Sequence, residues 1–248
     1  MDEPSRIEVT AFTHRGRVRA RNEDSIVVAG WVPEAAMAGP RRSRHALGDR
    51  EQERLADGVG GHVGGEVASR HATMCLAGKK PSSQPDCMAA QLAGINAELY
   101  GAMQDDPSLA GMGTTVAGLV LCPRRALWFN VGDSRVYLEH GGRFTQISID
   151  DVPPGPRYGI ITQTLGGCHS FFPISPHIGE EELDGENSLS RSRWLLCSDG
   201  LTDMLDDDEI AHAFARDDEK AVRALFDAAM AAGGSDNVSI IVVSAGGN

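Results

Sequence analysis

Residues 55–69 read LADGVGGHVGGEVAS, and the rest of the chain is organised around this stretch. A short apolar segment leads to Asp57 and then to a turn with five glycines in eight residues. Glycine lets the backbone adopt crowded or left-handed conformations and approach a bound ion closely. A dinucleotide-binding fingerprint is excluded because Val63 stands where its third glycine is needed. An aspartate aimed into a glycine-lined turn fits a hard-cation site, and a tight surface turn is the alternative.

The composition indicates a globular protein that does not bind nucleic acid. The chain has 248 residues, of which 41% are apolar, and a formal net charge of −12. This charge argues against nucleic acid or an anionic membrane as the main partner. The five cysteines are scattered, with no C-x-x-C pair, which predicts neither a disulfide framework nor a zinc site. A charged N-terminus and the lack of any long apolar run predict a cytoplasmic protein with no signal peptide and no membrane span.

The apolar pattern predicts runs of strands with helices outside them. Strands are expected over residues 7–12, 26–28, 116–121, 126–131, 135–139, 143–147, 194–198 and 238–244. Helices are expected from residue 65 onward and over residues 86–103, 207–215 and 219–232. Residues 33–53, rich in Pro, Ala and Arg, are expected to form an exposed loop. This order predicts antiparallel sheets covered by helices, and no clean linker divides the chain.

Four aspartates share one setting, at the end of a predicted strand and beside a glycine or an asparagine. They are Asp57, Asp133, Asp199 and Asp236. Several strand ends can meet at one cleft, where burying carboxylates together without a cation is unfavourable by several kcal/mol. Ligand sets made only of oxygen select Mg²⁺ or Mn²⁺ over zinc. For any one of the four, an ordinary turn aspartate is the alternative.

Other hydrolytic chemistries lack their residues. The sequence contains no G-x-S-x-G elbow and no H-E-x-x-H motif. No cysteine is followed by an arginine-closed phosphate loop, which argues against a thiolate phosphatase. The acidic run 206–208 precedes a predicted helix and is interpreted as a solvated helix cap.

Six motifs together resemble the metal-dependent protein phosphatases of the PPM (PP2C) family, bacterial type. In the family's order they are RARNEDS (19–25), ADGVGGH (56–62), GMGTT (111–115), VGDSR (131–135), LCSDG (196–200) and GSDN (234–237). The match covers almost the whole chain. The resemblance implies an α+β fold, a four-layer αββα sandwich of two antiparallel β-sheets flanked by helices, formed as a single domain over residues 1–248.

The resemblance also implies a binuclear Mn²⁺ or Mg²⁺ centre. By position, Asp57 would bridge the two ions, Asp199 and Asp236 would complete one of them, and the carbonyl of Gly58 would join the other. Asp133, together with Asp199, matches a weaker third metal site.

Four further residues are carried over from the first two motifs. Glu23 and Asp24 would hold metal-bound waters. Arg19 matches the phosphate-binding arginine, whose planar fork lysine cannot reproduce. His62 is the nearest candidate for the general acid that protonates the leaving oxygen.

The implied activity is hydrolysis of phosphoserine and phosphothreonine by a metal-activated water, with no covalent phosphoenzyme. The alternative is a catalytically weak relative that binds phosphoprotein partners. In either case the expected partners are phosphorylated proteins, including a Ser/Thr kinase or its substrates, and the expected state is a monomer.

Three departures from the family's pattern bear on the site. His14 stands where the family often has aspartate. The segment 49–54 is charged where relatives carry an apolar strand. The Pro-rich loop 151–159 replaces a longer helical flap, and this predicts a more open cleft on that side.

Overall fold

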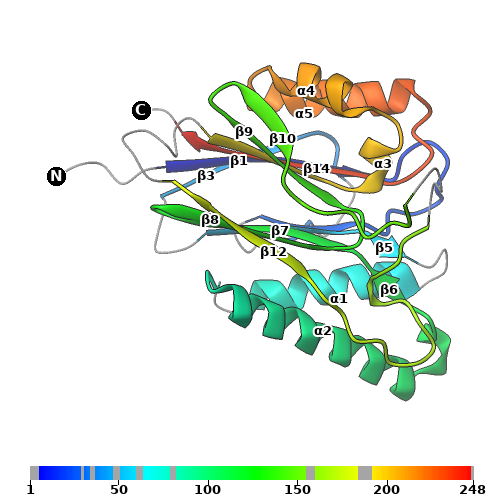
Figure 1. Cartoon of the computed structure of the whole chain (residues 1–248). Coiled ribbons are helices and arrows are strands. Elements are labelled where there is room, and N and C mark those ends of the chain that lie inside the picture. Colours follow the sequence, from blue (N-terminus) through cyan, green and yellow to red (C-terminus); the bar gives the residue numbers. More distant parts are fainter. Residues whose placement is uncertain are drawn as a thin grey trace.

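The structure is a computed structural model that describes residues 6–28, 31–33, 37–46, 51–59, 64–78, 82–154, 160–183 and 192–246. Two antiparallel sheets face each other, and helices cover their outer faces (Figure 1). The layers follow the order helix, sheet, sheet, helix. The predicted α+β sandwich is therefore confirmed.

The larger sheet has six strands and contains both ends of the described chain. In spatial order the strands are β10 (Arg143–Gln146), β9 (Arg135–His140), β13 (Ser192–Cys197), β14 (Val238–Gly246), β1 (Arg6–His14) and β3 (Arg41–Ala46). β1 and β14 pair along their whole length, from Arg6 with Gly246 to His14 with Val238. Its outer face carries α3 (Asp199–Thr202), α4 (Asp207–Phe214) and α5 (Asp218–Ala231).

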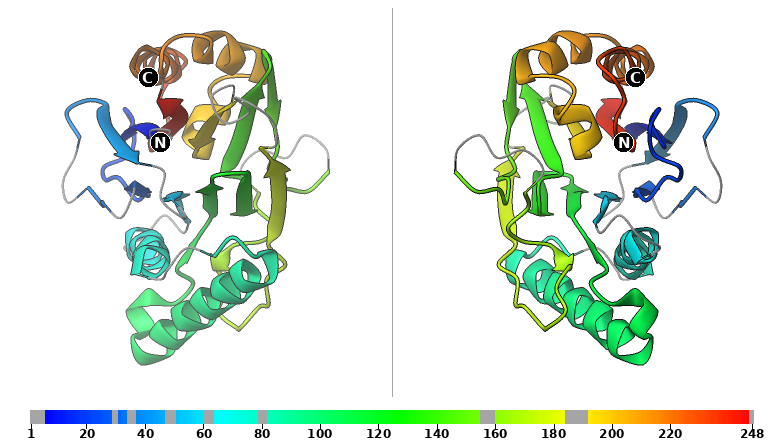
Figure 2. Two further views of the ribbon diagram at one scale, coloured as in Figure 1. Left: turned by 90° about the vertical axis from the view of Figure 1, so that its left-hand side faces the viewer. Right: turned by 90° about the vertical axis from the view of Figure 1, so that its right-hand side faces the viewer.

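The second sheet has five strands, and two long helices cover it. Its strands are β12 (His177–Glu182), β8 (Arg125–Val131), β7 (Val116–Cys122), β4 (Glu51–Ala56) and β2 (Ser25–Val28). Figure 2 shows α1 (Gly64–Gly78) and α2 (Pro85–Asp105) on the side of the molecule opposite α4 and α5. A small sheet of β11 (Leu165–Gly166), β6 (Gly113–Thr114) and β5 (Gly58–Val59) adjoins this layer, and a short 3-10 helix, Pro107–Leu109, follows α2.

Three apolar cores hold the four layers together. One lies between the two sheets and contains Trp194, the largest fully buried side chain. The second joins α1 and α2 to the five-stranded sheet, and the third joins α3, α4 and α5 to the six-stranded sheet. The helical spacing predicted for α2 is confirmed, because Met88, Leu92, Ile95 and Leu99 are all fully buried.

The prediction that residues 33–53 form an exposed loop is wrong for part of that range. Residues 41–46 form β3, which pairs with β1, and β4 begins at Glu51 and pairs with β2 and β7. Arg54 is buried, and burial lowers its pKa to about 10 against the opposing charge of Glu53. The charge of this segment concealed the strands because partners distant in sequence supply their ladder hydrogen bonds.

The expected short flap lies partly outside the described residues, since residues 155–159 are not among them. Residues 147–154 and 160–164, on either side, contain no helix and no strand. Nowhere in the described part of the chain is a helix both long enough and apolar enough to cross a bilayer.

Candidate metal centre

The strand-end aspartates gather at one end of the sandwich. Asp57 follows β4, Asp133 follows β8, Asp199 follows β13 and Asp236 precedes β14. Burial, and then the charges of Asp24 and Asp199, hold the pKa of Asp57 well above its usual value of 3.8. The predicted convergence of these carboxylates is thus present in the structure, and Asp24 joins them.

This cluster of carboxylates fits a hard cation. Three of its oxygens, the Oδ1 atoms of Asp24, Asp133 and Asp199, are buried and have no hydrogen-bond partner. Burial is the main cause that raises the pKa of Asp24 to about 6 and the pKa values of Asp133 and Asp199 to about 7. Buried acceptors without donors are costly, and a divalent cation bound by oxygen would satisfy them. The donor set contains only oxygen, which suits Mg²⁺ or Mn²⁺.

The backbone at Asp57 is fixed by the GMGTT motif. The carbonyl of Asp57 accepts hydrogen bonds from the Thr115 amide at 2.9 Å and from Thr114 Oγ1 at 2.7 Å. In return, the Asp57 amide donates to Thr115 Oγ1 at 3.3 Å. These bonds fix the backbone of Asp57 at the end of β4, the point from which its carboxylate enters the cluster.

Glycine is required immediately after Asp57 because α1 begins against it. A Cβ at Gly58 would lie 2.5 Å from the carbonyl carbon of Gly65 and 2.8 Å from the carbonyl oxygen of Glu23. A side chain at position 58 would therefore push α1 away from the Glu23 segment. His62, the predicted general acid, lies outside the described residues.

The arginine of the first motif reaches the cluster from its solvent side. Arg19 Nη2 donates to Asp236 Oδ2 at 2.5 Å, and the Arg19 side chain is 48% exposed. Deeper in the site, Asp24 Oδ2 accepts from Ser239 Oγ at 2.6 Å and from Ser198 Oγ at 3.0 Å. Arg19 is therefore placed at the mouth of the site, while Asp24 is fixed at its base.

Two residues without a predicted role hold the arginine loop. Asn237 Nδ2 donates to the carbonyls of Arg15 and Arg21 at 3.0 and 2.8 Å, and its Oδ1 accepts from the Glu23 amide at 2.7 Å. Gly16 has a φ of +72°, and a Cβ there would lie 2.0 Å from the carbonyl oxygen of Asp236. The GSDN motif contains Asn237, but its role could not be predicted because its partners lie more than 200 positions away.

His14 supports the start of the arginine loop. Its Nδ1 accepts from the Gly16 amide at 3.0 Å, and its ring lies against Phe12 and Phe226. Burial, together with the charge of Arg15, lowers the pKa of His14. A neutral imidazole is the form that accepts this hydrogen bond, so the loop keeps its support.

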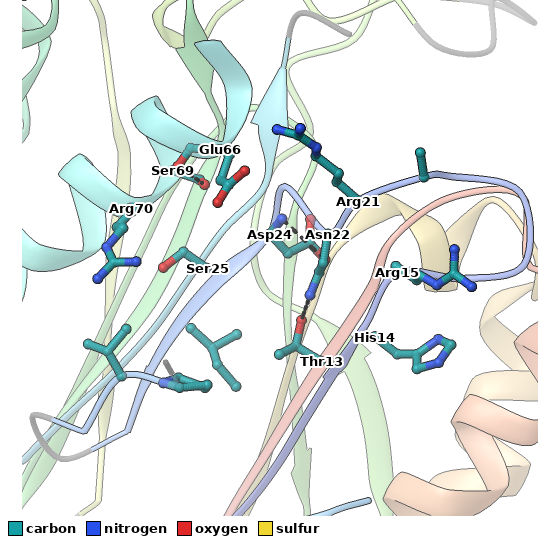
Figure 3. A pocket seen from close by; sticks show the side chains of 14 residues that line it. Thr13, His14, Arg15, Arg21, Asn22, Asp24, Ser25, Glu66, Ser69 and Arg70 are labelled. Atoms are coloured by element: carbon teal, nitrogen blue, oxygen red, sulfur yellow. Dashed lines mark hydrogen bonds between the residues drawn. The ribbon is translucent and has the colours of Figure 1, made fainter. Parts of the chain in front are cut away.

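A cleft of about 540 Å³ opens beside the carboxylate cluster. Figure 3 shows Arg15 and Arg21 on the loop side of this cleft and Arg70 on α1 opposite them. Asp24 also lines it, so the cleft reaches the acidic cluster. Among the described residues, the lining also contains Glu66, and Asp24 is the one clustered carboxylate in it, so the cleft borders the acidic cluster without enclosing it.

One further acid belongs to the neighbourhood of the site. Asp203, which directly follows α3, has a raised pKa because of burial and of the negative charge of Asp236. It has no glycine or asparagine beside it and follows a short helix rather than a strand, so the rule used for the other aspartates misses it.

Comparison with known proteins gives a consistent family match. The family model for Protein phosphatase 2C matches residues 49–233. The Serine/threonine protein phosphatase PstP of Mycobacterium tuberculosis is 32% identical over 248 residues, covering 95% of this chain and 44% of PstP. The chain therefore spans less than half the length of that curated relative. Protein phosphatase PhpP of Streptococcus pneumoniae is 29% identical, with 96% of this chain and 97% of PhpP covered.

Solved structures agree with this match. The crystal structure of the catalytic domain of PstP in complex with two manganese ions superposes with a TM-score of 0.73 at 30% identity. The superposition covers 97% of this chain and 99% of that domain.

Proposed function

The chain belongs to the protein phosphatase 2C family, and from this membership we propose that it hydrolyses phosphoserine and phosphothreonine in phosphorylated proteins with two Mn²⁺ or Mg²⁺ ions. The observation that carries the proposal is the cluster of buried carboxylates with unsatisfied oxygens beside Arg19. The two manganese ions in the related PstP domain support the choice of ion.

The roles of the oxygen ligands follow the family's motifs, and the carboxylate cluster supports them. Asp57 would contact both ions, Asp199 and Asp236 would complete one, and the Gly58 carbonyl would join the other. Asp133 would share a weaker third site with Asp199. Bound divalent ions supply an activated water near neutral pH and neutralise phosphoryl oxygens.

The remaining polar residues orient the site and the substrate. Glu23 and Asp24 would act on the ions through water, and the two serines on Asp24 Oδ2 keep that carboxylate turned toward the cluster. Arg19 would exchange its bond to Asp236 for a forked contact with the phosphoryl group, because Asp236 becomes a metal ligand. His62 would protonate the leaving serine or threonine oxygen.

We also infer that residues 1–248 form one domain. The pairing of β1 with β14 joins the two ends of the described chain in the centre of one sheet. The core between the sheets draws residues from strands of both sheets, among them β1, β2, β7, β13 and β14, so the two halves of the sandwich share it.

Hydrolysis of an aryl phosphate by the purified chain tests the proposal. We expect turnover with added Mn²⁺, loss of turnover in excess chelator, and loss of nearly all turnover in Asp57→Asn, Asp199→Asn and Asp236→Asn. Full turnover in excess chelator would contradict the metal mechanism. Absence of turnover in saturating Mn²⁺, with phosphoprotein binding retained, would instead support the catalytically weak binding module.

A further inference from the structure

A second group of metal-binding side chains lies on the helical layer that covers the five-stranded sheet. His71 Nε2 and Cys75 Sγ, on α1, and a carboxylate oxygen of Glu98, on α2, all lie within 4.8 Å of one another. His71 and Cys75 are four residues apart, so they share one face of α1. His71 lies about two helical turns beyond Gly64, where α1 leaves the carboxylate cluster.

The three donor atoms have nearly the spacing of a tetrahedral zinc site. Cys75 Sγ lies 3.1 Å from Glu98 Oε2 and 3.4 Å from His71 Nε2, and the last two atoms are 3.2 Å apart. Zinc bonds of about 2.3 Å to sulfur and about 2.0–2.1 Å to nitrogen or oxygen separate neighbouring ligands by about 3.4–3.6 Å. An outward movement of a few tenths of an ångström at each atom would therefore complete three corners of the tetrahedron.

The geometry is less suited to a proton relay. In a catalytic relay, the histidine accepts a proton from the nucleophile on one ring nitrogen and is oriented by an acidic side chain through the other. Among these three side chains, the His71 ring makes its contacts through Nε2 and the glutamate through Oε2. Three donor atoms that converge on a common centre are an arrangement that a single cation can bind.

We propose that His71, Cys75 and Glu98 bind one Zn²⁺ ion, or a similar borderline-soft divalent cation, with solvent water as the fourth ligand. The thiolate and carboxylate balance the charge of the ion, and the imidazole binds as the neutral ligand. The side chains of His71 and Glu98 are 36% and 46% exposed, which leaves room for the ion and its water to enter. Sulfur and nitrogen donors favour zinc over Mg²⁺, so this site differs in kind from the oxygen cluster.

This proposal departs from the expectation of no zinc site. That expectation rested on the absence of a C-x-x-C pair, but packing of α1 against α2 brings a cysteine, a histidine and a glutamate together without one. The only local signal is the spacing of His71 and Cys75 on one predicted helix.

The position of the site gives it a structural consequence. The opposite face of α1 supports the first motif, because Ser69 Oγ donates to the Glu23 carbonyl at 2.5 Å and Thr73 Oγ1 bonds Ser25 Oγ at 2.7 Å. An ion that joins α1 to α2 would therefore stiffen the helix on which Glu23 and Ser25 rest.

Titration of the metal-free chain with Co²⁺, in the presence of excess Mg²⁺, tests the proposal. Only thiolate ligation gives a sulfur-to-cobalt charge-transfer band in the near ultraviolet. We expect this band to saturate at one equivalent, to vanish in Cys75→Ser, and to require at least about tenfold more Co²⁺ in His71→Gln and Glu98→Gln. Cys87→Ser is the matched control, because Cys87 is an exposed cysteine on α2, and it should keep the band.

Thermal unfolding gives the second readout. Zn²⁺ should raise the melting temperature of the wild type more than that of Cys75→Ser, because only the wild type gains binding energy at this site. Equal melting temperatures of the two proteins in chelator would show that Cys75→Ser folds normally. Absence of the band in the wild type, or its persistence in Cys75→Ser, would show that these side chains only hydrogen-bond one another.

Discussion

At the scale of single residues, Asn237 shows how one buried side chain can hold a functional loop. It is only 4% exposed, and its amide bonds three backbone groups between Arg15 and Glu23. These bonds fix the path on which Arg19 and Glu23 approach the carboxylates. The loop has no helix or strand of its own, so its shape depends on this residue, on Gly16 and on His14.

Asn237→Ala should lower both stability and substrate affinity. Three hydrogen bonds worth about 1 kcal/mol each are removed, and two carbonyls and the Glu23 amide lose their partner. We expect a lower melting temperature together with a raised KM for aryl phosphate, measured by thermal unfolding and steady-state kinetics.

Asn96→Ala is the matched control for this change. Asn96 is 1% exposed on α2 and bonds the Phe172 carbonyl and the Gly166 amide, far in sequence from the arginine loop. It should lose comparable stability and keep its KM. An unchanged KM in Asn237→Ala would mean that the arginine loop keeps its shape without this residue.

Arg19→Ala should impair phosphate binding without affecting the fold. Its guanidinium is half exposed and, among the described residues, donates to Asp236, so truncation removes little packing. The expected signature is a raised KM with an unchanged melting temperature. Arg19→Lys should not restore the wild-type KM, because an ammonium group cannot form the forked contact. Parallel loss of melting temperature and activity would make Arg19 a structural ion-pair partner.

The sequence predicts much of the site but not its supports. Asp57, Asp133, Asp199 and Asp236 were identified because each lies at the end of a predicted strand beside a glycine or an asparagine. A strand end fixes where a carboxylate lies relative to a sheet. This rule could not identify Asp203, Thr114, Thr115 or the loop contacts of Asn237. Those roles depend on which segments meet in space, and no local pattern records that.

At the scale of elements, periodicity located the segments that bury one apolar face. The helices α2, α4 and α5 and the strands β1, β7, β8, β9 and β14 were predicted close to their observed bounds. β3 and β4 were missed because their residues are charged. β3 is held against β1 partly by Arg42 and Arg44, which both contact the buried Glu8.

Glu8→Gln should weaken the pairing of β1 with β3 in a pH-dependent way. Burial raises the pKa of Glu8, but Arg42 and Arg44 outweigh it, and the net pKa lies below the usual 4.5. A depressed pKa stabilises the fold above the unfolded value of about 4.5, and the effect is lost as pH falls through the folded pKa. The difference in unfolding free energy between wild type and Glu8→Gln should therefore be largest at neutral pH and shrink below about pH 4.5.

Denaturant unfolding over a pH series measures this difference. Glu219→Gln is the control, because Glu219 forms an exposed pair with Arg223 on α5, and such pairs contribute about 0.5 kcal/mol or less. A Glu8→Gln effect that is equally large at acidic and neutral pH would assign it to packing rather than to the two arginines.

At the scale of the whole molecule, the sandwich explains why the site lies where it does. Antiparallel strands of the two facing sheets end at a common rim, and β4 and β8 of one sheet deliver Asp57 and Asp133 there. β13 and β14 of the other sheet deliver Asp199 and Asp236 to the same rim. Three apolar cores hold these ends in place, so the mutual repulsion of the carboxylates is opposed by the whole fold.

The same architecture predicts modest discrimination among phosphopeptides. The described residues beside the site, 147–154 and 160–164, include no helix that could form a covering flap. The cleft is lined by Arg15, Arg21 and Arg70, whose charges attract anionic groups without selecting one side-chain shape. Selectivity should therefore come mainly from the metal centre and Arg19, and a large protein partner would supply any further specificity. Values of kcat/KM over a varied set of phosphothreonine peptides should span less than about a hundredfold, which corresponds to about 3 kcal/mol in transition-state binding. A wider span would mean that side chains around the cleft read the peptide sequence directly.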